Sequence, residues 1–355
     1  MNAPTPKRSV PGVTTVIPCR NEAPYLPRLL ADLAAQDYEG QLEVIVADGT
    51  SEDGSAQIID AAAVSIPWSS SARVLRRIPN PDRTIPCAMN RGVSAASHGF
   101  IVRVDAHATV PPDYVRKLTE VIVRGELHVV GPRKEFLPPS NSLVARCIAR
   151  AVSSRVARGK TELPQRASFI RPVIHAGLSC YARSTFLSVG GFDETLRSNE
   201  DFDFDYRCHK KGYRVGVRTD IVFYSFSKSS LIDLARQRLR YGFWRSQSLM
   251  QRPASLQPRQ IAPVILVWYL GAWIGALIAG GQIAVPMSIV VGGYALVLIG
   301  AGGVLGNREL GIRGVVLIAA ALFVVHVAWG LGFLAGGVSR VLGSLRSIGD
   351  NATSN

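Results

Sequence analysis

The sequence of 355 residues predicts a doubly wound α/β domain, followed by a basic amphipathic helix and by transmembrane helices. Three observations predict this architecture. Short β-rich runs alternate with helical patterns over the first 110 residues, and such alternation is typical of a largely parallel sheet. A strongly basic stretch then occupies 229–260. From residue 261 onward the chain is almost free of charged side chains.

The predicted strands and helices of the sheet domain follow one another closely. Segments 13–18 and 42–47 are β-rich, and the segment between them has helical periodicity. The apolar face of that helix consists of Leu26, Leu29, Leu30 and Leu33. Further along, SAQIIDAAA predicts a helix, RVLRRI a strand, CAMNRGVSAAS a helix and FIVRV a strand. We expect ligands to bind at the carboxyl ends of these strands.

Polar side chains follow three of the predicted strands. Residues 20–22 (RNE), Asp48 and Asp105 each stand after a strand, which predicts one site at the sheet edge. Asp105 and His107 are two positions apart and point to the same side of an extended chain. One oxygen and one nitrogen are too few for an all-protein metal site, but they suit a divalent ion that a diphosphate also holds. Alternatively, His107 donates a hydrogen bond to the phosphates while Asp105 alone binds the metal.

A run of acidic residues lies at 200–205, where Glu200 and Asp201 stand before Phe202. One interpretation is a helix N-terminus, because the helix dipole favours acidic residues there. The other is a catalytic carboxylate that removes the proton from an acceptor hydroxyl. Both hold if the helix begins at the active edge of the sheet. The pattern by itself does not choose among the acids.

The last third of the chain predicts membrane association. Segment 230–251 predicts an amphipathic helix at the membrane interface, with Tyr241 and Trp244 at headgroup depth. Three uncharged stretches follow, at 263–281, 283–305 and 312–334. Each is long enough to cross about 30 Å of hydrocarbon, whereas a hairpin buried in a soluble core fits three successive stretches poorly. Arg308 and Arg313 in the second connection, and an N-terminus without an apolar signal segment, put the large domain in the cytoplasm.

Charge and cysteine usage narrow the classes of function. The formal net charge is +14, although the mean hydropathy is +0.17. A basic region beside an apolar tail suits anionic lipid headgroups or phosphate-bearing substrates. No nucleic-acid partner is expected, because the sequence lacks a repeated aromatic and basic pattern. The five cysteines form no C-x-x-C pair, so neither a zinc site nor a disulfide framework is predicted.

Five motifs, in order along the chain, resemble those of a family 2 glycosyltransferase of the GT-A fold. VIPCRNE at 16–22 resembles the family's V-x-P-x-x-N-E, and DGTSEDGS matches its D-D-x-S-x-D-x-T stretch, with Asp48 as the second Asp. Asn90 and Gly92, with the later VDAH, match N-x-G…D-x-D. GGFDE followed by NED matches the acceptor-side motif, and QRLRY at 237–241 resembles Q-x-x-R-W.

The resemblance covers roughly residues 13–245 and is greatest to the ExoA-like enzymes of succinoglycan biosynthesis. The chain departs from the family's pattern at three positions, which are Ala47, His107 and Tyr241. The resemblance implies donor and nucleotide binding by Pro18, Arg20, Glu22, Asp48, Asn90 and Asp105. It implies a divalent cation, Mn²⁺ or Mg²⁺, at Asp105 and His107, and Asp201 as the catalytic base. The acceptor or the diphosphate would then lie near Glu200, Gln237, Arg238 and Arg240.

The predicted domain organisation has five parts. They are a flexible N-terminus at 1–12, a GT-A catalytic domain at 13–228, an interface segment at 229–260, a transmembrane region of about three helices at 261–338 and a tail at 339–355. Within the catalytic domain, the nucleotide-sugar half is expected at 13–110 and the acceptor half at 111–228.

The predicted function is that of a multi-pass enzyme of the inner (cytoplasmic) membrane with a cytoplasmic catalytic domain. It would move a sugar, with inversion, from UDP-glucose or another UDP-hexose to a polyprenyl-diphosphate-linked saccharide in exopolysaccharide or cell-envelope glycan synthesis. The alternatives are a polyprenyl-phosphate glycosyltransferase, a processive polysaccharide synthase, for which three short spans are few, and a catalytically silent membrane scaffold.

Overall fold

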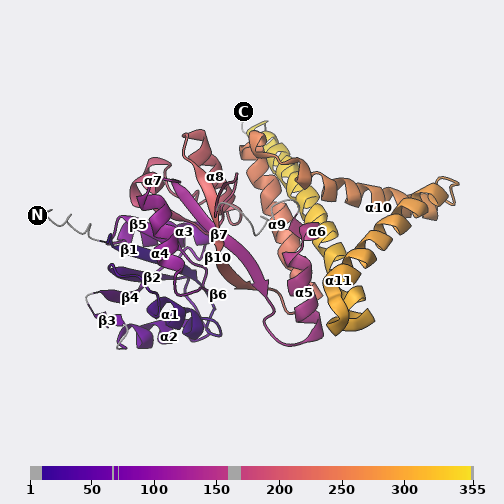
Figure 1. The fold of residues 1–355 in the computed structure, drawn as a ribbon. Helices are drawn as coiled ribbons and strands as arrows, with labels where there is room; N and C mark the ends of the chain where they lie inside the picture. The colour runs from indigo at the N-terminus through magenta and orange to yellow at the C-terminus, as the bar shows by residue number, and fades with distance from the viewer. Residues whose placement is uncertain (1–9, 66–67, 71, 159–168, 353–355) are drawn as a thin grey trace, which may run out of the picture. The chain divides into compact units, whose positions relative to one another are not determined.

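The computed structural model of the chain describes residues 10–65, 68–70, 72–158 and 169–352. The chain divides into two compact units (Figure 1). Unit 1 comprises residues 1–135 and 165–225, and unit 2 comprises 136–164 and 226–355. Most of the predicted flexible N-terminus lies outside the described residues, and the predicted domain boundaries stay a prediction.

Unit 1 is built on a mixed sheet. Across the sheet the strands are β3 (Ser69–Ser70), β4 (Arg73–Pro79), β2 (Leu42–Asp48), β1 (Val13–Cys19), β5 (Phe100–Arg103), β9 (Cys180–Ala182), β7 (Val129–Leu137), β10 (Val215–Phe226) and β6 (Ala108–Thr109), and β8 (Ile170–Pro172) pairs with β10. Strands β4, β2, β1 and β5 are parallel neighbours, whereas β9 runs antiparallel to β5 and β7. The predicted doubly wound α/β fold is confirmed in the parallel part of this sheet.

The described part of unit 1 contains several helices, of which the one at 55–63 has the predicted bounds. They are α1 (Leu26–Ala34), α2 (Ser55–Ala63), α3 (Ile85–Ala95), α4 (Tyr114–Val123), α7 (Arg183–Ser188) and α8 (Glu200–Lys210). Helix α3 starts after Thr84, whose hydroxyl accepts a hydrogen bond from the backbone N–H of Cys87. Such a cap satisfies one of the free donors of the first turn, so α3 begins earlier than the apolar pattern alone predicts.

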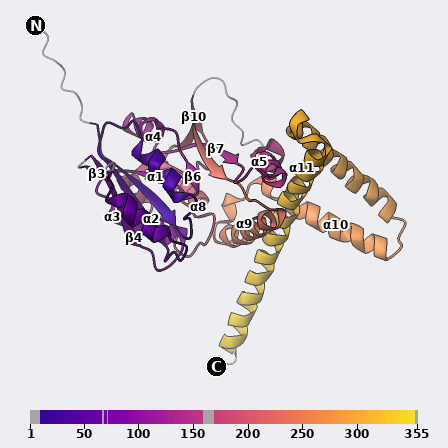
Figure 2. The same cartoon turned by 90° about the horizontal axis from the view of Figure 1, so that it is seen from below.

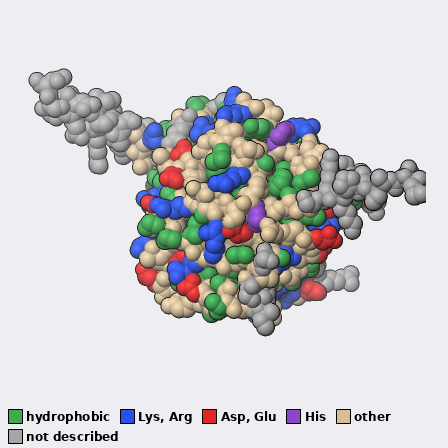
Figure 3. All heavy atoms as spheres, turned by 90° about the vertical axis from the view of Figure 1, so that its left-hand side faces the viewer, with side chains coloured by type: hydrophobic (Ala, Val, Ile, Leu, Met, Phe, Trp, Pro, Cys, Tyr) green, Lys and Arg blue, Asp and Glu red, His purple; other side chains and the backbone are tan. Residues whose placement is uncertain are grey.

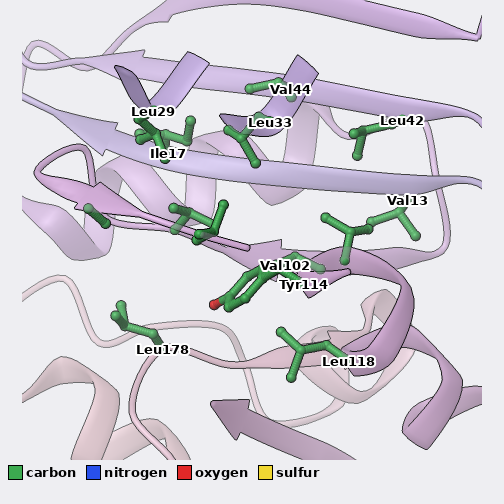
Figure 4. Packing of buried hydrophobic residues seen from close by; sticks show 14 of the residues in the cluster. Val13, Ile17, Leu29, Leu33, Leu42, Val44, Val102, Tyr114, Leu118 and Leu178 are labelled. Atoms are coloured by element: carbon green, nitrogen blue, oxygen red, sulfur yellow. The ribbon is translucent and has the colours of Figure 1, made fainter. Parts of the chain in front are cut away.

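Both faces of the sheet in unit 1 are covered by helices. On one face Ile17 lies beside Leu29 of α1, and Val102 lies beside Tyr114 of α4 (Figure 4). The four leucines of the predicted apolar face of α1 are all buried. On the opposite face α3 packs against β1 and β2. The outer surface of unit 1 in Figure 3 carries basic and acidic side chains in small interspersed groups.

Unit 2 is helical. It contains α5 (Leu143–Ser153), α6 (Arg155–Arg158), α9 (Leu231–Gln251), the short 3₁₀ helices η2 (Pro253–Ser255) and η3 (Pro258–Gln260), α10 (Ala262–Ile278) and α11 (Ala284–Ala352). Its apolar core joins Cys147 and Ile148 of α5, Leu234 of α9, and Ile318 and Leu322 of α11. The predicted basic helix is therefore present as α9, and part of its surface is buried against apolar helices.

Helix α11 changes direction along its length (Figures 1 and 2). Gly311 lies within it in a left-handed backbone conformation, with φ of 58°, which glycine adopts without steric cost. Two parts of α11 are long and apolar enough to cross a membrane, Ala284–Gly306 with 23 residues and Glu309–Arg340 with 32 residues. Helix α10 is apolar but shorter, with 17 residues. The predicted count of about three spans stays a prediction.

Helix α9 packs closely along α11. A Cβ atom on Gly332 would lie 2.0 Å from the carbonyl oxygen of Leu239, and one on Gly336 would lie 2.5 Å from that of Phe243. Only glycine leaves room for the two backbones at these positions, as in helix pairs that use small residues four apart. The Gln247 side chain donates a hydrogen bond to the Gly336 carbonyl (2.8 Å). The predicted location of α9 at a membrane interface stays a prediction.

Candidate active site

The carboxyl ends of three parallel strands lie side by side in unit 1. Cys19, the last residue of β1, is paired with Asp48, the last residue of β2, and β5 lies on the other side of β1. Pro18 is half-buried in β1, and Arg20 is exposed directly after it. The topology therefore brings residues 20–22, Asp48 and Asp105 to one edge of the sheet, as the sequence pattern predicts.

The loops after β1 and β2 hold each other in place. The backbone N–H of Asn21 donates to the hydroxyl of Ser51 (3.0 Å), and that of Glu22 donates to the hydroxyl of Ser55 (2.9 Å). Asn21 and Thr50 have left-handed backbones, with φ of 56° and 59°. This conformation is uncommon for residues other than glycine, and such residues cluster at functional sites.

The carboxylate of Asp48 is buried between these loops. Its Oδ1 accepts hydrogen bonds from the backbone N–H (3.1 Å) and the hydroxyl (2.6 Å) of Ser51, and its Oδ2 lies 3.7 Å from a guanidinium nitrogen of Arg77. Burial, with the nearby charges of Asp48 and Glu22, raises the pKa of the Cys19 thiol to about 12. Cys19 therefore stays a neutral thiol, and the strand end beside it is acidic.

A buried arginine joins the end of β5 to the start of α8. Arg103 donates from Nε to Asp105 Oδ1 (3.2 Å), and its Nη1 forms an ion pair with Glu200 Oε1 (3.0 Å). The guanidinium also lies over the ring of Phe192, 5.9 Å from its centroid. Only 4% of the Arg103 side chain is exposed. Arg103 is not among the site residues predicted from the sequence, although a charged side chain within an apolar strand, two positions before Asp105, is a signal for it.

The two carboxylates beside Arg103 respond differently to its charge. Burial by itself raises the pKa of Asp105, but the charges of Arg103, Lys134 and His107 outweigh burial and hold that pKa below its usual range. Burial raises the pKa of Glu200, and neighbouring Asp201 acts in the same direction, while Arg103 offsets only part of this. Asp105 is therefore the carboxylate of this pair that stays ionised to lower pH.

His107 pairs with Glu22. Its Nδ1 lies 3.0 Å from Glu22 Oε1, and its ring meets that of Tyr25 edge-on with centroids 6.4 Å apart. The sequence predicts His107 at a metal or at phosphates and Glu22 at the donor, but it does not predict a contact between the two. The contact engages Nδ1, and both side chains are partly exposed.

The structure distinguishes among the acids at 200–205, which the sequence pattern does not. Helix α8 begins at Glu200, after Asn199 with its left-handed backbone. The Asp201 side chain is 28% exposed, whereas the carboxylates of Glu200, Asp203 and Asp205 are at most 5% exposed. Each of these three has a basic partner: Glu200 pairs with Arg103, Asp203 with Arg207 and Asp205 with His175. Asp201 is thus the acid of this run that solvent reaches.

Asn90 links α3 to the GGFDE segment. Its side-chain amide donates to the carbonyl of Phe192 (2.9 Å) and to Glu194 (2.8 Å), and its Oδ1 accepts from the backbone N–H of Phe192 (2.9 Å). These contacts make Asn90 a bridge between two motifs. They give no support to its predicted contact with the donor, which stays a prediction.

The predicted acceptor-side residues Gln237, Arg238 and Arg240 lie on α9 and belong to unit 2. Gln237 donates to the hydroxyl of Tyr241 (3.3 Å), and the Arg238 guanidinium lies 5.8 Å from the centroid of the same ring. Arg240 is exposed. Within unit 2, Gln237 and Arg238 thus form a cluster with the ring of Tyr241 on one helix.

A metal site was predicted at Asp105 and His107. Within the part of the chain that the structure describes, no group of three or more His, Cys, Asp or Glu side chains could hold a metal ion. A cation at these two residues would therefore need further ligands, and diphosphate oxygens are suitable ones. A second histidine, His175, lies against α8, and no sequence motif predicts a role for it.

Two family models match the chain. The model described as Glycosyl transferase family 2 matches residues 14–170, and the model described as Glycosyl transferase family group 2 matches residues 100–334. The succinoglycan biosynthesis protein ExoA of Rhizobium meliloti (strain 1021) is 32% identical over 325 residues, covering 90% of this chain and 92% of ExoA.

Other similar proteins cover less of the chain or are more distant. The undecaprenyl-phosphate 4-deoxy-4-formamido-L-arabinose transferase of Aeromonas hydrophila subsp. hydrophila is 30% identical over 186 residues, covering 50% of this chain and 54% of that protein. The structure of the mannosyltransferase PcManGT from Pyrobaculum calidifontis, in complex with GDP-Man and Mn²⁺, has a TM-score of 0.60 and 21% identity, covering 92% and 89% of the two chains. At that identity the similarity shows a shared fold. Taken with the ExoA match and the five motifs, the findings show that this chain belongs to glycosyl transferase family 2, a family of inverting enzymes that use nucleotide sugars.

Proposed function

We propose that the chain is a membrane-anchored inverting glycosyltransferase in which Asp201 is the catalytic base. The observation that carries this proposal is the buried Arg103, which binds Asp105 at the end of β5 and Glu200 at the start of α8. Since Asp201 follows Glu200 and is partly exposed, its carboxylate is available beside the strand end where the donor would bind.

The reaction follows from this arrangement. Asp201 accepts the proton of an acceptor hydroxyl, and the hydroxyl oxygen attacks the anomeric carbon of the donor as the bond to the nucleoside diphosphate breaks. A single displacement inverts the configuration, so an α-linked donor yields a β-glycoside. Residues 20–22, Asp48 and Asp105 would bind the nucleotide sugar. The loops that hold each other in place by hydrogen bonds would keep these groups in fixed positions.

A divalent cation, Mn²⁺ or Mg²⁺, fits this site in part. Asp105 keeps its negative charge to low pH because the nearby charges hold its pKa below the usual range, and His107, two positions later, would supply a nitrogen ligand. The diphosphate would supply the remaining ligands. When bound, the cation would neutralise charge on the leaving diphosphate. The His107 pairing with Glu22 leaves Nε2 as the ring nitrogen available for this role.

The proposed donor is UDP-glucose or another UDP-hexose, and the proposed acceptor is a polyprenyl-diphosphate-linked saccharide. The similarity to ExoA over almost the whole chain supports a role in exopolysaccharide synthesis. The candidate spans within α11 support anchoring in the inner membrane. Arg238 and Arg240 on α9, with Gln237, would bind the diphosphate of the lipid carrier or the acceptor.

A second function has a specific observation in its favour. The Aeromonas relative is named for transfer to undecaprenyl phosphate, so this chain could load a sugar onto a lipid phosphate itself. A phosphate acceptor is already ionised at neutral pH and needs no strong base. The two functions therefore differ in how much they depend on Asp201.

The test is a donor screen with a matched pair of enzymes. Membranes containing wild-type protein or Asp201→Asn receive a panel of UDP- and GDP-sugars with Mn²⁺, Mg²⁺ or EDTA, and released nucleoside diphosphate and lipid products are measured. We expect transfer by the wild type, its loss with EDTA, and at least a 100-fold loss of kcat in D201N with nucleotide binding retained. Substantial D201N activity with polyprenyl phosphate would instead support the second function. If no donor yields a nucleoside diphosphate, neither transferase function holds, and the catalytically silent membrane scaffold is the alternative that is left.

A further inference from the structure

A histidine outside the sequence motifs lies between two carboxylates of α8. His175 stands in the segment between β8 and β9, in the tripeptide His-Ala-Gly. Its Nδ1 lies 2.8 Å from Asp205 Oδ2, and its Nε2 lies 3.7 Å from Asp201 Oδ2. Asp201 and Asp205 are four residues apart on one helix, so their side chains share a face and a single ring can reach both.

Asp205 holds the ring firmly. Its carboxylate is fully buried, and its Oδ2 accepts hydrogen bonds from the backbone N–H groups of Ala176 (2.7 Å) and Gly177 (3.3 Å) as well as facing His175 Nδ1. An ionised carboxylate is acceptor-only, so Nδ1 is the protonated nitrogen that donates to it. The ring of Phe202 packs at 5.5 Å between centroids and limits its rotation. These contacts direct the other ring nitrogen, Nε2, toward Asp201.

Asp201 has a different set of contacts. Its Oδ1 accepts from the backbone N–H of Phe202 (2.8 Å), while its Oδ2 faces His175. The separation of 3.7 Å is longer than a hydrogen bond. Catalytic hydrogen bonds are often longer in a protein without substrate and shorten in the reacting complex. His175, with 32% of its side chain exposed, is open to the same solvent as Asp201.

We propose that His175 is a positioning residue that orients the Asp201 carboxylate for deprotonation of the acceptor. The proposal rests on the proposed function of Asp201. In its cationic form the ring donates from Nδ1 to Asp205 and from Nε2 to Asp201. It thereby fixes the rotation of the Asp201 carboxylate, with Oδ2 held by the ring and Oδ1 by the backbone N–H of Phe202. A carboxylate has further lone pairs, and one of these accepts the proton of the acceptor hydroxyl. Asp205 serves in turn to hold the ring.

Two substitutions separate this role from a purely structural one. In His175→Asn the side-chain amide can still donate to Asp205, as Nδ1 does, but nothing reaches Asp201. In His175→Gln the amide lies near the position of Nε2 and can reach Asp201. We expect H175N to lower kcat about 10- to 100-fold, the usual range for a lost hydrogen bond to a charged group or a misplaced base. We expect H175Q to recover much of that loss.

The measurements are kcat, the KM for the donor, nucleotide affinity and Tm for wild type, H175N, H175Q and D201N in the same detergent. A lower kcat for H175N with donor KM, nucleotide affinity and Tm near wild type supports the proposal. Wild-type kcat in H175N overturns it, and so does an equal loss in H175N and H175Q, which indicates a structural role. If H175N matches wild type while D201N is inactive, only the role of His175 fails. A wild type that transfers no sugar to any acceptor overturns the proposed function and this inference together.

Discussion

At the scale of single residues, the candidate site depends on a few charged side chains that are buried together. Arg103 forms ion pairs with Asp105 and Glu200, which come from different parts of the chain. Removing one partner of a buried ion pair leaves a charge without compensation in a medium of low dielectric constant, and this costs far more than the loss of a surface pair. Arg103 is therefore both a structural requirement and the link between the donor-side strand and α8.

Substitution of Arg103 tests this link. Arg103→Met is expected to lower the free energy of unfolding by about 3–5 kcal/mol and to reduce kcat/KM, because the buried Glu200 and the largely buried Asp105 lose their cation. Arg103→Lys keeps the charge but not the forked geometry, so its effects are expected to be smaller. The matched control is Arg116→Met, which removes the exposed pair with Asp37 and is expected to cost at most about 1 kcal/mol. Thermal denaturation in detergent and steady-state kinetics measure both, and equal stability of R103M and R116M would contradict the assignment.

At the scale of secondary-structure elements, one buried carboxylate ties three strands of unit 1 to the segment that follows α3. Glu43 on β2 accepts hydrogen bonds from Thr14 of β1 (2.7 Å), from Arg76 of β4 (2.7 and 2.9 Å) and from the backbone N–H of Ser97 after α3 (2.8 Å). Burial acts to raise the pKa of Glu43, but these hydrogen bonds outweigh it and the pKa lies below its usual range. The parallel part of the sheet therefore depends on an ionised Glu43.

This dependence predicts an acid-sensitive contribution to stability. An unfolded glutamate has a pKa of about 4.3, so between that value and the lower native pKa the unfolded chain binds more protons. The stabilisation by Glu43 is fully present above about pH 4.3 and is lost as the pH falls through the native pKa. We expect the Tm difference between wild type and Glu43→Gln to be large at pH 7 and to shrink below pH 4. Glu39→Gln, at an exposed position, is the control, and a difference that does not change with pH would contradict the prediction.

At the scale of the whole molecule, the chain combines a sheet domain with a helical unit whose surface is largely apolar. Large exposed side chains of α10 and α11 include Trp268, Ile278, Ile289 and Val304. A soluble protein rarely exposes so much apolar surface, because contact with water is unfavourable. In a lipid bilayer the same apolar side chains contact hydrocarbon, and the N–H and C=O groups of the backbone form their hydrogen bonds within the helix.

We expect the protein to behave as an integral membrane protein with its sheet domain in the cytoplasm. Alkaline carbonate should leave it in the membrane pellet, whereas a mild detergent should release it, because helices in the hydrocarbon are not held by charge. Protease added to inside-out vesicles should digest unit 1, and protease added to right-side-out vesicles should leave it intact. Release by carbonate alone would show that the apolar helices are buried against protein instead.

The sequence by itself determined the fold class, the family and the edge of the sheet where the site lies. Periodicity and motif order are local properties, and residues that follow parallel strands must meet at one edge whatever their exact contacts. Only the tertiary structure decided which side chains touch there. It paired His107 with Glu22, 85 residues apart, and placed His175 against Asp205, 30 residues apart. It also buried Glu200 on Arg103 and left Asp201 partly exposed. Burial and pairing between distant segments arise from packing of the whole domain, and no periodicity along the chain encodes them.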